Sequence, residues 1–488
     1  MKSRISPHGS CYVNFAEHLQ NRWNVNLLYP GAPNQWTSKD WRSFLTMVKE
    51  FGYTCFEYWL VPTLYDTPAL GGGGIYGSFA QTMQEVNDIA HGLGLLTKYV
   101  CPPNTIGPSW YFACPNDPDD RKLILDLWRH WAKALDGTDI VGIFPGDPGG
   151  CNRNGCTHRT FLKLALDLVE VTIHENPGAR IELGTWGTPF SGWGSDLRTV
   201  PNWDGTWEML LDPAFVTPET PVHIWNGQRD RAREAMEDLV RALPAFPTDV
   251  MVAINLGFSP DGNDTMGGDA TEYAREISRT NQIVTWDYSL SEGELVTYPH
   301  WRLPRMAARR REELAAAPYA GGMNYTMSPK LNLLTLYAAG KLFSDPTSDP
   351  NTLSRNFAAQ VFGEEHAAIG DLFEAFEVVD GWGHYPRREW SNSQLTAAFS
   401  EMIERLEAFD PASCTLPLFP DVSTYADDLL WFARSFREMA SDAPDRQRIR
   451  QEFWSRSLSI YDAIPMSVDE RAHEAANRFA AIRASNAR

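Results

Sequence analysis

The stretch DIVGIFPGDPGG, residues 139–150, joins a short apolar run to a turn rich in proline and glycine. Such a run is typical of a strand buried on both faces of a parallel sheet. Similar runs recur along the chain, with amphipathic helical stretches between them, at residues 25–29, 54–60, 95–100, 180–186, 222–226, 250–256, 283–288 and 321–326. Repeated strand–helix units predict parallel strands joined by right-handed crossovers.

The expected α/β fold is an eight-stranded (β/α)8 TIM barrel, and a doubly wound open sheet is the alternative. Nine candidate strands exceed the eight that a barrel needs, so one is expected to be an accessory strand or a loop. Residues 222–226 or 250–256 are the expected exception. Between strands, residues 41–48, 124–131 and 161–168 carry apolar side chains at helical spacing. Asp117 before Pro118 predicts the start of a helix.

From about Ser344 the pattern becomes helical throughout. Asp349 before Pro350 predicts a helix start and Gly363 its end. Further helices are expected at residues 369–379, 395–408, 424–439 and 447–464. The sequence therefore predicts a (β/α)8 catalytic barrel over residues 1–343 and an all-α C-terminal domain over residues 344–488.

Composition narrows the range of partners and compartments. The 488 residues include 43 Lys and Arg against 62 Asp and Glu, a net charge of −19. Such a charge argues against nucleic acid or an anionic membrane as the main partner. We find no apolar run of membrane-spanning length, no signal-peptide pattern, and seven scattered cysteines, an odd number. These features indicate a cytoplasmic protein with reduced thiols, and pairing into a homo-oligomer through helical surfaces is possible.

In a (β/α) barrel the active site lies at the C-terminal ends of the strands, and polar and aromatic residues gather there in this sequence. The catalytic candidates are Asp147, Asp287, Glu57 and Glu294. The substrate-binding candidates are Trp59, Trp186, Trp225, Asn226, Trp286, Tyr288, Asn324, Tyr325 and His158. Acids for the glycosidic bond, amides for hydroxyl groups and flat rings for stacking are what a carbohydrate site needs. A small carbohydrate is therefore the expected substrate.

The segment from Cys151 to His158 has C-x4-C-x-H spacing, with Cys156 between. Sulfur and imidazole ligands of this kind could hold zinc, but a structural zinc site usually shows four ligands. A loop with free thiols is the preferred interpretation, and we expect no metal and no cofactor. His158 could instead lie near the substrate beside Asp147.

Three stretches resemble glycoside hydrolases. IVTWDYSLSEG, residues 283–293, is similar to the W-D-N-Y-P-x-N-D segment of O-GlcNAc hydrolases, and GIFPGDPGG, residues 142–150, falls where those enzymes carry their catalytic aspartates. The stretch from GGMNYT to QVFG, residues 321–363, resembles their last barrel unit and also α-glucuronidases. The resemblance implies a (β/α)8 glycosidase acting from the chain end.

By this resemblance Asp147 matches the catalytic acid, Asp287 a hydroxyl-binding aspartate, and Asn324 a substrate contact on the last strand. O-GlcNAc hydrolases carry two adjacent aspartates, whereas Asp147 lies between Gly146 and Pro148. The expected mechanism therefore uses Asp147 as acid with Asp287, Glu57 or Glu294 as the second carboxylate. The alternatives are a metal-dependent sugar isomerase, epimerase or lyase, and a non-catalytic sugar-binding barrel.

Overall fold

The structure is a computed structural model of the whole chain. It describes residues 9–13, 37–60, 79–106, 111–145, 151, 154–185, 233–247, 249–255, 267–287, 303–326, 333–379 and 390–441. The expected strands at 25–29 and 222–226 and the expected helix at 447–464 lie outside these residues.

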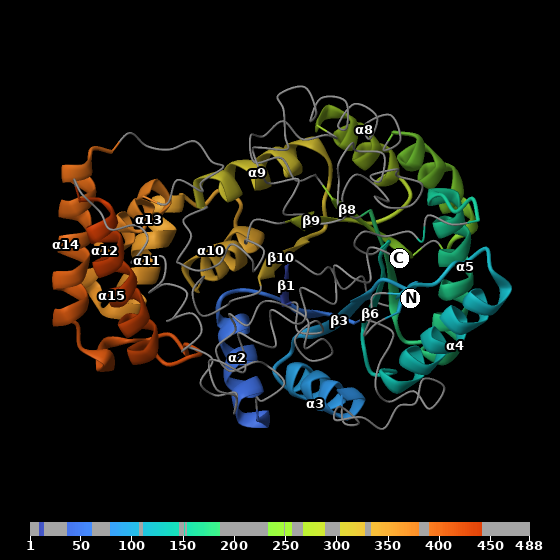
Figure 1. Ribbon diagram of the computed structural model, residues 1–488, viewed down its shortest axis with the longest axis horizontal. Coiled ribbons are helices and arrows are strands. Elements are labelled where there is room, and N and C mark those ends of the chain that lie inside the picture. The colour runs from blue at the N-terminus through green and yellow to red at the C-terminus, as the bar shows by residue number, and fades with distance from the viewer. Residues whose placement is uncertain are drawn as a thin grey trace.

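Eight parallel strands form a closed barrel (Figure 1). In chain order they are β1 (Ser10–Val13), β2 (Cys55–Trp59), β3 (Leu96–Cys101), β6 (Ile140–Ile143), β7 (Arg180–Gly184), β8 (Met251–Asn255), β9 (Ile283–Asp287) and β10 (Gly322–Thr326). Strand β1 closes the ring, because its residues pair in parallel with β10 on one side and β2 on the other. All the C-terminal strand ends therefore lie at the same end of the barrel.

Helices follow the strands and cover the outside of the barrel (Figure 1). They are α2 (Ser38–Glu50), α3 (Phe79–Gly92), α4 (Pro118–Ala134), α5 (His158–Glu175), α8 (Gly267–Ile277), α9 (Leu303–Ala316) and α10 (Leu333–Ser344), with residues 233–242 also helical. Helix α4 starts as predicted, because the Asp117 side chain accepts the backbone N–H groups of Asp119 and Asp120. The predicted α/β fold of parallel strands and helices is confirmed.

Two short elements lie between strands and helices. The hairpin of β4 (Thr105–Ile106) and β5 (Tyr111–Phe112) is antiparallel and separates β3 from α4. A turn of 3-10 helix, η4 (Leu243–Ala245), precedes β8.

The structure differs from the sequence prediction at one barrel strand and decides the place of another. Strand β1 was missed, because four residues with the sequence SCYV are too short to show a period. Pairing on both edges, rather than their own apolarity, makes them a strand. Residues 250–256 were one of two candidates for the segment outside the barrel, yet β8 pairs with β7 and β9 inside it. Residues Val250 to Ile254 are as buried as the other strands, which explains their place in the ring.

The C-terminal region is helical, as predicted. It contains α11 (Pro350–Phe362), η6 (Glu364–His366), α12 (Ile369–Leu372), α13 (Glu374–Val379), α14 (Asn392–Ala408), η7 (Pro411–Ser413) and α15 (Val422–Met439). Asp349 caps α11, since its side chain accepts the Thr352 N–H, and Gly363 ends the helix with a φ of 98°. These helices form a group at one side of the barrel (Figure 1).

Aromatic residues join the helical region to the barrel. Tyr337 of α10 lies edge-on to Phe51 and also contacts Phe357 of α11, both with ring centroids 5.4 Å apart. Phe419 contacts Phe44 of α2 at 6.3 Å. At Gly340 an added Cβ atom would lie 2.4 Å from the Phe51 carbonyl oxygen, so only glycine permits this approach. One continuous apolar core therefore runs from the barrel into the helices.

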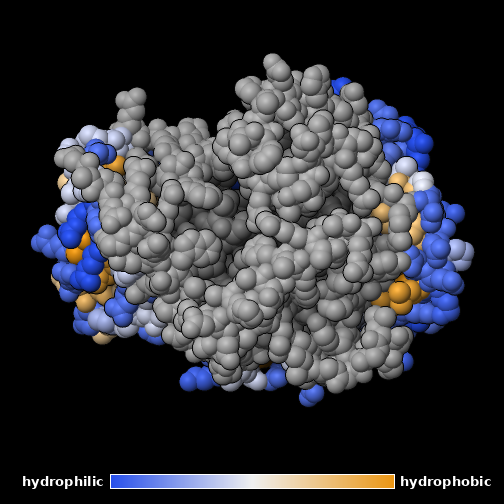
Figure 2. Space-filling view, in the orientation of Figure 1, coloured by the Kyte–Doolittle hydropathy of each residue, from blue (hydrophilic) through white to orange (hydrophobic). Residues whose placement is uncertain are grey.

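The surface is mainly hydrophilic where it can be described. Figure 2 shows the coloured residues at both ends of the molecule as mostly polar, with scattered apolar ones. Among the described residues the exposed large hydrophobic side chains are Ile173 and Leu314. Within the same parts of the chain, no helix combines the length and the apolar content that crossing a bilayer requires.

Candidate active site

The barrel encloses a charged group of three side chains. Lys98 of β3 lies between Glu57 of β2 and Glu182 of β7, with its Nζ atom 3.0 Å from Glu57 Oε2 and hydrogen-bonded to Glu182 Oε1. The exposed fractions of Glu57, Lys98 and Glu182 are 0%, 2% and 1%. Charges so far from water persist only when they are paired, and here each carboxylate shares the same ammonium group.

The two carboxylates keep the lysine charged. Burial alone lowers the pKa of Lys98, because the charged form loses its hydration. The negative charges of Glu182 and Glu57 outweigh burial and raise the pKa above its ordinary value. The group therefore holds one ammonium between two carboxylates, inside a barrel wall whose N-terminal layer is apolar and contains Cys55, Ile140 and Met251.

Aromatic rings lie between this charged group and the C-terminal end of the barrel. The Phe144 and Trp286 rings are 4.1 Å apart between centroids, and Lys98 Nζ is 6.0 Å from the centre of the Phe144 ring. Gly184 makes room for Phe144, because an added Cβ atom there would lie 2.3 Å from the ring. Phe144 directly follows β6 and Trp286 is the penultimate residue of β9. The ring contact therefore joins the ends of two strands that β7 and β8 separate in the wall.

Several predicted site residues lie at this end of the barrel. Trp59 ends β2 and Asp287 ends β9, while Tyr325 is the penultimate residue of β10. For Asp287 and Tyr325 the structure describes the backbone but not the side chain. Six other candidates fall outside the described residues, namely Asp147, Glu294, Trp186, Trp225, Asn226 and Tyr288. Asp147 follows the last residue of β6 by four positions.

Three described candidates are buried rather than open to a ligand. Glu57 is paired with Lys98, as given above. Trp286 is 1% exposed and packs on Phe144, and Trp59 is 5% exposed. These contacts favour a supporting role for all three beneath the end of the barrel. The contact of Glu57 with Lys98 argues against its predicted role as the second carboxylate, because its side chain is already engaged in an ion pair.

The hydrogen bonds of Asn324 lead toward α10, outside the barrel. Its amide donates a hydrogen bond of 3.2 Å to the Tyr53 hydroxyl, which in turn donates one of 2.9 Å to the Leu336 carbonyl. All three groups are buried. This chain of hydrogen bonds connects β10 to α10, so the described contacts of Asn324 are structural.

His158 is separated from the cysteines that precede it in the sequence. It is the first residue of α5, and its Nε2 atom lies 2.6 Å from Asp238 Oδ2, on helical residues 233–242. Arg159 donates to the same Asp238 oxygen at 2.5 Å, and Arg241 also donates to Asp238. The ligand set C-x4-C-x-H is therefore not assembled. Instead, Cys114 joins Cys151 and Cys156.

Replacing Asp238 with Asn is expected to destabilise the protein at neutral pH but not in acid. Partial burial alone raises the pKa of Asp238, but hydrogen bonds from His158, Arg241 and Arg159 outweigh it and hold the pKa well below its usual value. The stabilisation is therefore complete above the unfolded pKa of about 3.9 and is lost as the pH falls toward the folded pKa. Hydrogen bonds to charged groups predict a loss of about 1.5–3 kcal/mol at pH 7.

Urea unfolding of both proteins at a series of pH values measures this difference. The gap in unfolding free energy should narrow steadily below about pH 4. A gap that stays constant across the series would show that the carboxylate charge is not responsible.

Sequence reasoning missed Lys98, Glu182 and Cys114. A signal was present for the first two. Lys98 is the one charged residue of β3, LTKYVC, and Glu182 lies within β7, RIELG, whose other charged residue, Arg180, stands at the start of the strand. A charged residue in the middle of a buried strand indicates a buried partner. Cys114 gave no signal, since it is remote in sequence from Cys151.

The sequence matches no protein-family model and no curated protein. Solved structures that match the chain include an O-GlcNAc hydrolase mutant of Thermobaculum terrenum, at 12% identity and a TM-score of 0.44 over 92% of each chain. A protein named CpGH84D is 11% identical, with a TM-score of 0.45 over 88% of this chain and 67% of that one. D-Psicose 3-epimerase from Clostridium cellulolyticum H10 is 13% identical, with a TM-score of 0.33 over 74% of this chain and 98% of that one. Similarities this distant do not assign an activity.

Proposed function

We propose that the chain is an exo-acting glycoside hydrolase on a (β/α)8 barrel of the TIM type. In this proposal residues 1–343 form the catalytic barrel, residues 344–488 form the helical domain, and the substrate is a small oligosaccharide or glycoside. Asp147 is the general acid, and Asp287 or Glu294 is the second carboxylate.

The contact between Phe144 and Trp286 is the observation that carries this proposal. Asp147 comes three residues after Phe144, and Asp287 comes directly after Trp286. The two rings are 4.1 Å apart although 142 positions separate them in the chain numbering. Because the strands are parallel, β6 and β9 end on the same side of the barrel. This supports the proposal that Asp147 and Asp287, which follow Phe144 and Trp286 in the sequence, act on one substrate.

Two carboxylates at one site can hydrolyse a glycosidic bond without further groups. The acid gives its proton to the oxygen of the leaving group, while the second carboxylate attacks the anomeric carbon or activates a water. The acid must hold a proton near neutral pH, and apolar surroundings favour the neutral form of a carboxyl group. In this proposal the Lys98 group has a structural role, because its side chains are buried and paired with one another and so link β2, β3 and β7.

A panel of chromogenic glycosides tests this function with the purified full chain. The panel includes hexosides, uronides and N-acetylhexosaminides in both anomeric forms, and release of the chromophore is measured. We expect hydrolysis of at least one class. Sugar binding without turnover across the panel, or isomerisation of the free sugar instead of hydrolysis, would overturn the proposal.

A further inference from the structure

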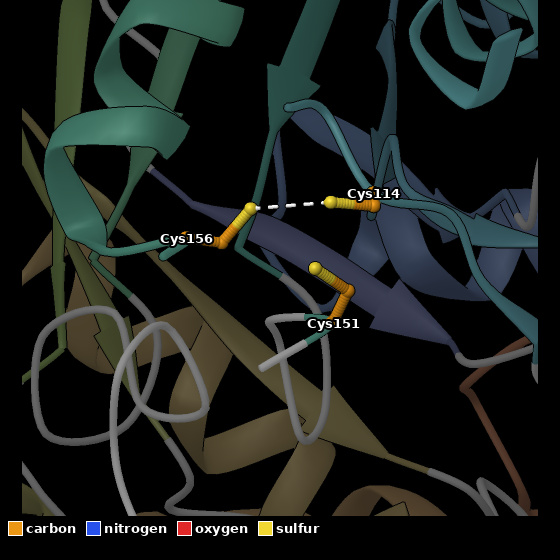
Figure 3. A group of neighbouring side chains, drawn as sticks. All are labelled: Cys114, Cys151 and Cys156. Carbon is orange, nitrogen blue, oxygen red and sulfur yellow. Dashed lines mark hydrogen bonds between the residues drawn. The ribbon is translucent and has the colours of Figure 1, made fainter. Parts of the chain in front are cut away.

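Three cysteine thiols from two separate segments meet in the structure (Figure 3). Cys114 lies between β5 and α4, while Cys151 and Cys156 belong to the segment between β6 and α5. The Sγ atoms of Cys114 and Cys156 are 3.5 Å apart, and all three sulfur atoms lie within 4.8 Å of one another. The three side chains are buried, with exposed fractions of 1%, 4% and 4%.

The sulfur spacing fits a tetrahedral metal centre. A zinc–sulfur bond is about 2.3 Å long, so two sulfur ligands of a tetrahedral zinc lie about 3.8 Å apart. The 3.5 Å between Cys114 and Cys156 and the upper limit of 4.8 Å for the other two pairs bracket this value. A disulfide needs about 2.05 Å between two sulfur atoms and would leave the third thiol outside the bond. Shifts of well under the length of a bond would bring all three thiols onto one ion.

A hydrogen-bond donor beside Cys114 suits a thiolate at this position. The Asn154 side-chain amide donates to Cys114 Sγ at 3.4 Å. N–H donors that point at sulfur stabilise its negative form, which is the form that binds metal. Such donors form the outer shell that orients the ligands of metal centres.

The backbone is built to bring the two segments together. Asn154 and Gly155 have φ values of 52° and 68°, and this left-handed turn directs Cys156 toward Cys114. The Asn116 amide donates a 2.9 Å hydrogen bond to the Asn154 carbonyl and so joins the two loops beside the thiols. Asn154 is the one residue other than glycine with a positive φ among those described. Asparagine and glycine are the residues that adopt this conformation most readily, so the sequence favours the turn beside the thiols.

We propose that Cys114, Cys151 and Cys156 form a site for a thiophilic divalent metal ion of the zinc class, which fastens the loop after β6 to the loop after β5. Three thiolates supply three of the four tetrahedral positions, and the fourth is open among the described residues. No electron transfer is involved, because zinc does not change its oxidation state. The site stands independently of the proposed glycosidase, although residue 147 belongs to the loop that it would anchor.

Metal binding to the full chain tests the site. The protein is purified without chelator under reducing conditions, its zinc content is measured, and the metal-free form is titrated with Zn²⁺ and with Co²⁺. We expect about one zinc per chain, a rise in the melting temperature on zinc addition, and thiolate-to-cobalt charge-transfer absorption of the strength that three thiolates give. This spectrum is obtained on the unaltered protein and so does not depend on how well any variant folds.

Serine variants of each cluster cysteine identify the ligands, and Cys414→Ser is the matched control, since Cys414 lies outside the cluster. Each cluster variant should weaken zinc binding by at least about 10-fold, the smallest loss that even outer-shell changes cause. The control should bind as the unaltered protein does. Absence of cobalt–thiolate absorption, equal zinc affinity in Cys151→Ser and Cys414→Ser, or a Cys114–Cys156 disulfide found by differential alkylation would overturn the proposal.

Discussion

Replacing Lys98 with Met is expected to lower the free energy of unfolding by about 3–5 kcal/mol, the cost of removing one partner from a buried ion pair. Met keeps most of the volume of the side chain but removes its charge. Glu57 and Glu182 would then remain in the barrel interior with no cation between them, although their exposed fractions are only 0% and 1%. Denaturant unfolding at neutral pH measures the loss.

Lys122→Met is the matched control for this prediction. Lys122 also pairs with a carboxylate, Asp126, but its side chain is 76% exposed, and such pairs contribute about 1 kcal/mol at most. Combining Lys98→Met with Glu57→Gln and Glu182→Gln should recover part of the loss, because the unpaired charges are then removed. A Lys98→Met protein within about 1 kcal/mol of the unaltered one would contradict the importance of the buried charges.

Replacing Asp147 with Asn is expected to lower kcat by about 10²–10⁴-fold on any glycoside that the protein hydrolyses, the usual contribution of a general acid. Asn has nearly the same shape but cannot give a proton to the leaving oxygen. KM should change little, because binding of the ground state does not require that proton. Substrates with a good leaving group should lose less, since they need less protonation.

Asp139→Asn is the matched control, because Asp139 precedes β6 whereas Asp147 follows it. Asp139 lies at the other end of the barrel, where it accepts the Thr97 N–H at 2.8 Å and contacts His91 at 2.8 Å. Its replacement should affect stability and leave kcat nearly unchanged. If Asp147→Asn retained activity on all leaving groups, another residue would have to be the acid.

The strand–helix pattern was predictable from the sequence because most elements carry their own signal. The run DIVGIF became β6 and its continuation, and the Asp–Pro pairs at 117–118 and 349–350 became helix starts. These signals are local, so they do not depend on what the element packs against. Strand β1 could not be found in this way, because its four residues depend on pairing with β2 and β10.

The candidate site was predictable only in part. The choice of the polar residues after β6 and β9 as candidates rests on the rule that parallel strands end at one side of the barrel. The ion pairs inside the barrel could not be predicted in this way, because Lys98 and Glu182 are 84 positions apart in the chain. The meeting of Cys114 with Cys156 depends on the mutual placement of two loops, and no spacing in the sequence encodes it. The contact of His158 with Asp238 spans 80 positions of the chain, so it could not be predicted for the same reason.

The way in which β1 joins β10 has a consequence for how the protein is made. The N-terminal strand must wait for residues 322–326, which leave the ribosome more than 300 residues later. Until then the nascent sheet has unpaired edges that could recruit other chains, and such edges are a common cause of aggregation during synthesis. Slow translation or a holding chaperone should therefore matter most in the interval before the last barrel strand emerges.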